Sequence, residues 1–229
     1  MRRSAPVRFG SVRVRTPLVT PGLRVGIMGG TFNPPHAGHV LISHTALTRL
    51  RLHQLWWVVT PGNPLKETGG LPPLAERIEA CRAMTPDPRI RITGFEEQLG
   101  TPFTAATLGF LTLRYPRVRF VWVMGADNLA SFHRWQQWRE IMRMVPIAVV
   151  DRPGWRHRAL ASKAAYAFRS GYVPETQAAD LPVMTPPAWT LLTGPLSPLS
   201  STALRAMRRA AATGRQRRAS KSPAAGGQG

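Results

Sequence analysis

Two histidines and a glycine pair near the start of the chain are the residues best suited to chemistry. Gly29 and Gly30 end a short apolar run, so the backbone there can approach a ligand closely and present N–H groups to an anion. His36 and His39 follow, three residues apart at the expected start of a helix, which allows both imidazoles to lie on one face. Together these groups could hydrogen-bond phosphate oxygens.

Each of these features also has a plain structural explanation. Glycines often end a strand for packing reasons alone, and a lone histidine is most often a surface or core residue. A zinc site is a further alternative, but no other Cys or His lies at a supporting spacing, and His36 and His39 supply only two of the three or four ligands required. The spacing therefore favours an anion over a metal.

A second cluster of polar residues lies near the other end of the chain. Ser200, Ser201 and Thr202 occupy an expected helix start, and Arg205 follows one turn later. Hydroxyl donors, helix-start N–H groups and a forked guanidinium can converge on phosphate oxygens. The same pattern alone is commonly a simple helix cap, so its meaning depends on whether it meets the histidines.

An alternation of strands and helices must position both clusters. Short apolar runs predict strands, and apolar residues at spacings near 3.6 predict helices. The predicted strands are 23–28, 55–60, 90–93, 119–124, 147–150 and 189–192, and the predicted helices are 39–52, 74–84, 104–114, 135–143, 155–170 and one that starts at Ser201. This pattern predicts a single-domain α/β fold, a doubly wound, Rossmann-like parallel sheet with helices on both faces. In such sheets ligands bind where the connections change direction, so we expect the site after Met28 and Met124.

The formal charge of +20 is concentrated at the two ends of the chain. Residues 1–24 hold six arginines, and residues 205–229 hold six arginines and one lysine, with no acidic residue in either stretch. The other 18 basic residues face all 11 acidic ones, which leaves +7 for the core. We therefore expect a domain over residues 23–211, flanked by disordered basic extensions, 1–22 and 212–229, that contact polyanions non-specifically.

Compartment and membrane association follow from the same sequence. No apolar run approaches the length needed to cross a bilayer, and the only cysteine, Cys81, can form no internal disulfide. These features favour a cytoplasmic protein without a membrane span. The arginine-rich start would also suit an organelle transit peptide, which we regard as the weaker interpretation.

Taken together, the motifs resemble those of a known family. GGTFNPPHAGH at 29–39 is similar to the HxGH signature of the nucleotidyltransferase superfamily, and LSSTALR at 199–205 to its late SSTxIR-type signature, in the same order. The segment between them resembles bacterial nicotinate-nucleotide adenylyltransferases in PGNPLK at 61–66, TPFTAATL at 101–108, GADNLASFHRW at 125–135 and DRPG at 151–154. The resemblance spans residues 23–208.

The resemblance implies adenylyl transfer from ATP to nicotinate mononucleotide, which gives deamido-NAD and pyrophosphate in NAD biosynthesis. The attacking phosphate oxygen is largely ionised already, so alignment and charge stabilisation would supply the catalysis. The implied catalytic residues are His36, His39 and Arg205. Mg²⁺ would arrive with ATP and bridge its phosphates without protein side-chain ligands. The implied ATP-binding residues are Gly29, Gly30, Thr31, Phe32, His36, His39, Asp127, Ser201, Thr202 and Arg205.

The resemblance also implies where the acceptor binds. Trp135 would stack on the nicotinate ring, and Thr104 with neighbouring backbone N–H groups would meet the carboxylate. Phe103 would complete this pocket, and Lys66 and Arg152 would contact phosphate.

Two departures from the family pattern accompany the resemblance. Asn33 stands where the family often has Asp, and the chain after Arg205 lacks the usual closing run. Two alternatives stay open from the sequence: the same chemistry on nicotinamide mononucleotide or another phosphorylated acceptor, and a non-catalytic nucleotide- or RNA-binding protein that uses its basic tails. The oligomeric state is not indicated by any pattern in the sequence.

Overall fold

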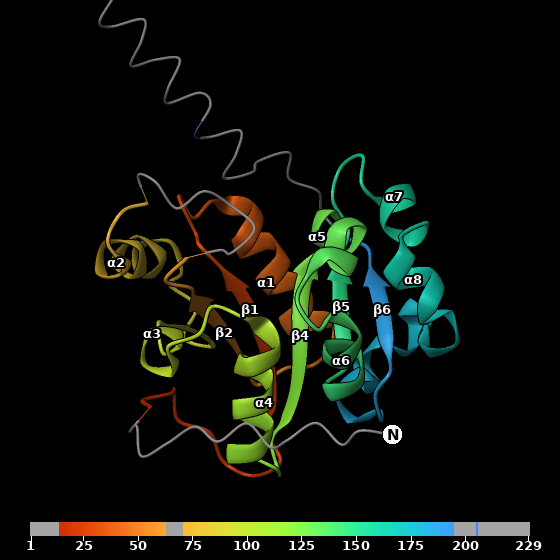
Figure 1. Cartoon of the computed structure of the whole chain (residues 1–229), viewed down its shortest axis with the longest axis horizontal. Helices are drawn as coiled ribbons and strands as arrows, with labels where there is room; N and C mark the ends of the chain where they lie inside the picture. Colours follow the sequence, from red (N-terminus) through yellow and green to blue (C-terminus); the bar gives the residue numbers. More distant parts are fainter. Residues whose placement is uncertain (1–13, 63–70, 195–204, 206–229) are drawn as a thin grey trace, which may run out of the picture.

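Six parallel strands form one sheet in the order β3-β2-β1-β4-β5-β6 (Figure 1). The computed structural model describes residues 14–62, 71–194 and 205. The strands are β1 Arg24–Gly30, β2 Gln54–Val59, β3 Ile90–Thr93, β4 Arg119–Gly125, β5 Ile147–Val150 and β6 Trp189–Leu192. All six predicted strands are confirmed, and the predicted doubly wound parallel sheet with them.

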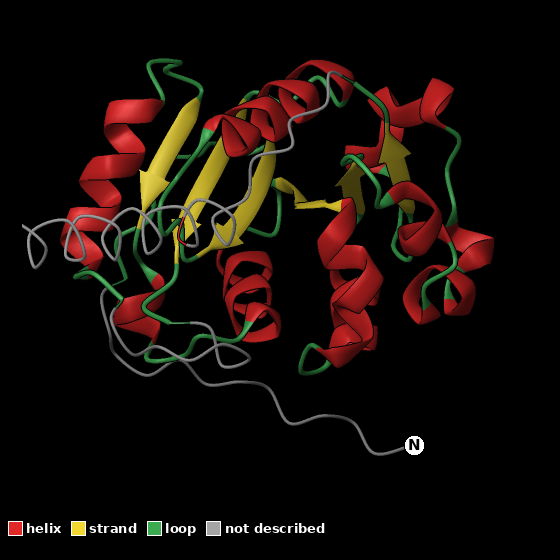
Figure 2. Ribbon diagram, turned by 90° about the horizontal axis from the view of Figure 1, so that it is seen from above, coloured by secondary structure: helices red, strands yellow, loops and turns green. Residues whose placement is uncertain are grey.

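Helices cover both faces of this sheet (Figure 2). They are α1 Ala37–Arg49, α2 Leu74–Met84, α3 Glu96–Leu99, α4 Thr104–Arg114, α5 Ala126–Ser131, α6 Trp138–Met144, α7 Arg156–Leu160 and α8 Lys163–Ala167, with 3₁₀ segments η1 Phe132–Arg134, η2 Arg169–Gly171 and η3 Glu175–Val183. Alternate strand residues belong to two separate cores, as the pleat of a strand requires. Trp56 of β2 packs in the core that includes residues of α4 and α6, and Trp57 in the core that includes residues of α1.

Three predicted helices have different bounds in the structure. The helix predicted over 39–52 is α1, Ala37–Arg49. The stretch 155–170 is not one helix, because Ser162 adopts an extended backbone and its hydroxyl accepts a hydrogen bond from the N–H of Ala165, which starts α8. The helix predicted from Trp135 begins at Trp138, since Gln137 has a left-handed backbone with φ 54°. The short helices α3 and α5 were not predicted, because four to six residues are too few to show a helical period.

The packed part of the chain begins earlier than residue 23. Val14 is 4% exposed and belongs to the core. The N–H of Arg15 donates to Oε1 of Gln98 at 2.8 Å, and the N–H of Gly22 donates to the carbonyl oxygen of Arg117 at 2.7 Å. Residues 14–22 therefore lie against the domain, and the rest of the predicted extensions, 1–13 and 212–229, lies outside the described residues. No helix in the described part of the chain is long and apolar enough to span a membrane.

The strand order places a crevice at the centre of the sheet. The chain passes from β1 to β2 and β3 on one side and then returns to β4 on the other side of β1, so the connections diverge between β1 and β4. Gly30 ends β1 and Gly125 ends β4 at the same edge. The loops after Met28 and Met124, where the sequence predicts the site, thus lie at one edge of the sheet.

Candidate active site

The two histidines form one unit at the start of α1. His36 is the N-cap residue, and its Nδ1 accepts a hydrogen bond from the N–H of Gly38 at 3.1 Å. Nδ1 of His39 accepts from the backbone N–H of His36 at 3.2 Å, and the two ring centroids lie 3.8 Å apart. With Nδ1 of both rings engaged as an acceptor, the proton of each neutral imidazole sits on Nε2. The pair therefore presents two N–H donors from one face, as the spacing predicts.

Both imidazoles are neutral near pH 7. Burial, aided by the charge of Arg152, lowers the pKa of His36 to about 4. Burial also lowers the pKa of His39 to about 3, with His36 and Arg152 adding to the effect. The histidines are therefore placed to donate hydrogen bonds and do not carry fixed positive charge.

Arg205 of the late motif contacts Asn33 of the early motif. Arg205 donates from Nη1 to the carbonyl oxygen of Asn33 at 2.6 Å, across 172 positions of sequence. Asn33 takes part through its backbone, so this contact does not depend on the carboxylate that the family often has there. Ser201 and Thr202, predicted to bind phosphate beside Arg205, lie outside the described residues.

Asp127 and Arg152 form an ion pair next to the histidines. Nη1 of Arg152 lies 2.7 Å from Oδ2 of Asp127, which is in the first turn of α5. A Cβ on Gly125 would approach Oδ1 of Asp127 to 2.5 Å, so a glycine at this strand end makes room for the pair. Because Arg152 depresses the pKa of both imidazoles, it lies on the histidine side of the site. Arg152 does not line the aromatic pocket at this edge of the sheet.

Phe32 and Gly29 have structural roles that the motif does not reveal. The ring of Phe32 is 2% exposed and stacks on Trp57 with centroids 4.8 Å apart, so its backbone is what it can offer to ATP. A Cβ on Gly29 would lie 2.7 Å from the indole of Trp122. The packing explanation of the glycine pair therefore holds for Gly29, whose backbone also lines the pocket.

A buried arginine, which the sequence did not identify, joins the loops around the site. Arg77 of α2 donates from Nη1 to the carbonyl oxygens of Thr31 at 2.9 Å and Thr60 at 2.8 Å. It also donates to the carbonyls of Pro61 and Pro72. The arginine thus ties the loop after β1 to the loop after β2. On an amphipathic helix such a residue looks like ordinary surface charge, so the sequence carried no signal for it.

A pocket of about 220 Å³ opens at the end of β1, where Gly29 and Gly30 line it. Aromatic side chains form part of its walls. The rings of Trp122 and Trp135 pack edge to face there, with centroids 6.1 Å apart. Phe103, Thr104 and Trp135, the three residues predicted to hold the acceptor ring, all line it, whereas the predicted contact Lys66 lies outside the described residues. The full lining consists of Gly29, Gly30, Thr60, Gly62, Glu96, Pro102, Phe103, Thr104, Trp122, Arg134, Trp135 and Gln136.

One carboxyl group lines this pocket. Glu96 is 4% exposed, and its Oε1 accepts a hydrogen bond from the hydroxyl of Thr107 at 2.6 Å. Burial raises the pKa of Glu96 and outweighs the opposing effect of the Thr107 and Thr60 hydroxyls. No pattern in the sequence distinguishes Glu96 from its neighbour Glu97, which is exposed.

Comparisons with known proteins agree with this geometry. A family model described as cytidylyltransferase-like matches residues 27–207. A probable nicotinate-nucleotide adenylyltransferase of Methylorubrum extorquens is 54% identical over 80% of this chain and 99% of its own length. That of Rhizobium meliloti is 56% identical over 80% and 97%. The fold is similar to a Plasmodium falciparum nicotinic acid mononucleotide adenylyltransferase complexed with NaAD, with a TM-score of 0.58 at 16% identity, covering 79% of this chain and 82% of that one. The chain belongs to the nicotinate-nucleotide adenylyltransferase family of cytidylyltransferase-like proteins.

Proposed function

We propose that this chain transfers the adenylyl group of ATP to nicotinate mononucleotide. The observation that carries the proposal is the junction of the two distant motifs, Arg205 with Asn33, at the strand ends that also form an aromatic pocket. The names of relatives more than 50% identical over nearly their whole length support the same reaction. The product would be deamido-NAD, and the reaction would serve NAD biosynthesis.

The reaction needs alignment more than proton transfer. A phosphate oxygen of the acceptor attacks the α-phosphorus of ATP, a new P–O bond forms, and the bond to the β-phosphate oxygen breaks so that pyrophosphate leaves with its electrons. The nucleophile is already ionised, so no general base is required. Nε2–H of His36 and of His39 would donate to phosphate oxygens as charge develops, and Arg205 would act on the pyrophosphate from the other side.

ATP would enter as its Mg²⁺ complex, a substrate in which the metal ion would offset part of the phosphate charge. No cluster of three or more His, Cys, Asp or Glu side chains suited to a metal occurs within the described ranges. Asp127 has a buried Oδ1 without a hydrogen-bond partner, which makes it a suitable acceptor for a hydroxyl of the nucleotide.

The acceptor ring would bind in the aromatic pocket. Trp135 offers a surface for stacking, and Thr104 is the first residue of α4, whose N-terminus has no side-chain cap. Uncapped N–H groups at a helix start favour a carboxylate. We place the reaction in the cytoplasm, in keeping with a buried, unpaired Cys81 thiol.

Pyrophosphate release tests the proposal. The full chain is assayed with ATP and Mg²⁺ plus nicotinate mononucleotide, nicotinamide mononucleotide or no acceptor. We expect rapid release with the acid, slower release with the amide and none without an acceptor. Equal or faster release with the amide would refute the deamido assignment, and no release with either mononucleotide would refute adenylyl transfer to pyridine nucleotides.

A further inference from the structure

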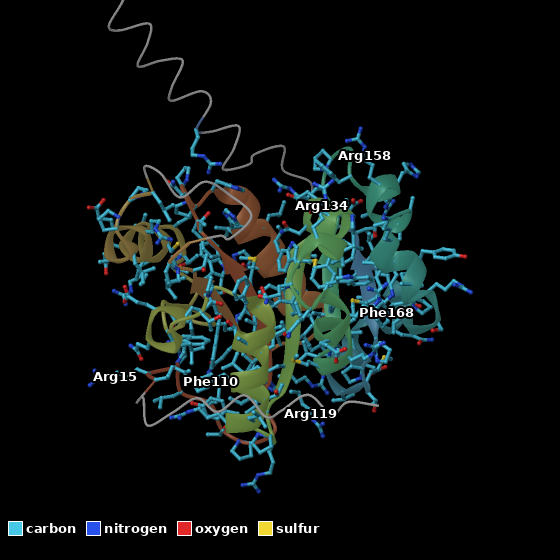
Figure 3. All side chains as sticks on the ribbon, in the orientation of Figure 1. Arg15, Phe110, Arg119, Arg134, Arg158 and Phe168 are labelled. Atoms are coloured by element: carbon cyan, nitrogen blue, oxygen red, sulfur yellow. The ribbon has the colours of Figure 1, made fainter. Side chains whose placement is uncertain are left out.

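Arg134 is the only basic residue in the described lining of the acceptor pocket. It ends η1, directly before Trp135, and its side chain is exposed. Figure 3 labels Arg134 near α5, at the opposite end of the sheet from Arg119, the first residue of β4. Its guanidinium therefore belongs to the edge of the sheet where the substrates meet.

The charge of Arg134 is not neutralised by the carboxyl that shares the pocket. Within the described residues, neither Arg134 nor Glu96 forms an ion pair. Glu96 instead bonds the hydroxyl of Thr107, and Thr60 provides a second hydroxyl contact. The positive charge at the pocket is therefore available to an incoming anion.

Burial raises the pKa of Glu96 above the ordinary value of a carboxyl group, although the hydroxyls of Thr107 and Thr60 oppose the shift. A raised pKa reduces the negative charge that the group carries at a given pH. Glu96 therefore attracts Arg134 and repels a negative ligand less than an exposed carboxylate would.

We propose that Arg134 is a specificity-determining residue whose guanidinium pairs with the carboxylate of the acceptor ring, while Glu96 stays bonded to the hydroxyl of Thr107 and does not compete. This inference rests on the proposed function. Arg134 adjoins Trp135, the stacking surface, and shares the pocket with Thr104, so the group it meets is the ring substituent. The acceptor phosphate must instead point to the histidine unit, where the α-phosphorus of ATP would lie.

The test compares Arg134→Gln with the wild-type chain on nicotinate and nicotinamide mononucleotides, which differ only in that substituent. Losing a charged hydrogen bond should lower kcat/KM for the acid by about 10- to 100-fold and for the amide by less than about threefold. Arg139→Gln is the matched control, because Arg139 is a nearby arginine that lies over the Trp138 ring and outside the pocket. It should leave both values unchanged.

Two results would overturn the inference. Equal losses with both acceptors would mean that Arg134 contacts the phosphate they share, and no loss with either would mean that it contacts neither.

Glu96→Gln, a neutral replacement, should keep the acid-to-amide ratio of kcat/KM within about threefold. A larger change would show that Glu96 competes with the acceptor for Arg134, and would also contradict the inference. If the wild-type chain did not prefer the acid, the proposed function itself would be wrong. If Arg134→Gln left the ratio of kcat/KM for the acid to that for the amide unchanged, only this inference would be wrong.

Discussion

In the proposed reaction His36 and His39 are neutral donors, because burial lowers their pKa values and backbone N–H groups occupy both Nδ1 atoms. A preorganised donor of this kind stabilises charge at the reacting phosphate without first having to be oriented. We expect His39→Ala to lower kcat by about 100- to 1,000-fold, measured by pyrophosphate release. His157→Ala, at an exposed histidine outside the site, serves as the control. Near-normal turnover of His39→Ala would contradict the donor role.

The lowered histidine pKa values also predict how stability depends on pH. The unfolded chain binds a proton on each imidazole below about pH 6.5, whereas the folded chain does so only near pH 4 for His36 and near pH 3 for His39. Their contribution is therefore present above the unfolded pKa and is lost as the pH falls toward the folded values. The unfolding midpoint should drop between about pH 7 and about pH 5, and less so in His36→Gln/His39→Gln. If the unfolding midpoint fell equally steeply with pH in the wild-type chain and in the double variant, the histidines would not be the cause.

Several site residues could be predicted from the sequence and others could not. The i,i+3 spacing identified the histidine pair, and the family resemblance identified Thr104 and Trp135. Glu96 lies on a four-residue helix that is too short for a period to separate it from Glu97. The burial of Arg77 could not be predicted either. Its partners are backbone carbonyls, which every residue has, so no residue type in the sequence indicates them.

At the scale of elements, α2 positions the substrate loops through Arg77. We expect Arg77→Met to lower the free energy of unfolding by about 2–4 kcal/mol, because carbonyl oxygens of the loops lose their donor. Since the residue ties the loop at Thr31 to the loop at Thr60, KM for both substrates should rise together.

The matched control for this prediction is Arg82→Met on the same helix. Arg82 is exposed and pairs with Glu79, so its loss should change stability by less than about 0.5 kcal/mol. Chemical unfolding and steady-state kinetics measure both effects. A stable Arg77→Met variant with unchanged KM values would show that the loops hold their positions without the arginine.

The elements themselves followed closely from residue patterns. Most of the strands could be predicted because a strand buried between two helical layers is a continuous run of apolar residues. The edge strand β3, with its exposed Arg91, is the exception. The helix predicted over 155–170 was wrong because a local cap at Ser162 replaced the helical backbone with an extended one. Such competition between side chain and backbone is decided by geometry that periodicity does not record.

At the scale of the whole molecule, the strand order explains why motifs 172 positions apart act at one place. The chain connections diverge between β1 and β4, and Arg205 contacts the loop after β1 from the far end of the chain. The sequence predicted this meeting only through two motifs in order, since periodicity does not give strand order. The basic ends, in contrast, have no predicted part in the site.

Removing residues 1–13 and 212–229 tests that separation. The cut is placed before Val14, since residues 14–22 pack on the domain. We expect the shortened chain to keep wild-type kcat and to lose the salt-sensitive binding of polyanions such as heparin, because the arginine-rich ends supply that charge. If the shortened chain lost turnover but still bound polyanions, the ends would be needed for catalysis and the domain would supply the polyanion binding, which would contradict this prediction.

Adenylyl transfer to the acid acceptor is tested most directly by competition in one reaction. ATP labelled at its α-phosphate is mixed with the full chain, Mg²⁺ and equal amounts of nicotinate and nicotinamide mononucleotides, and the products are separated. We predict that the label accumulates mainly in deamido-NAD, with none retained on the protein, because the acceptor phosphate attacks the α-phosphorus directly. Label found mainly in NAD, on the protein, or in neither dinucleotide would contradict the account.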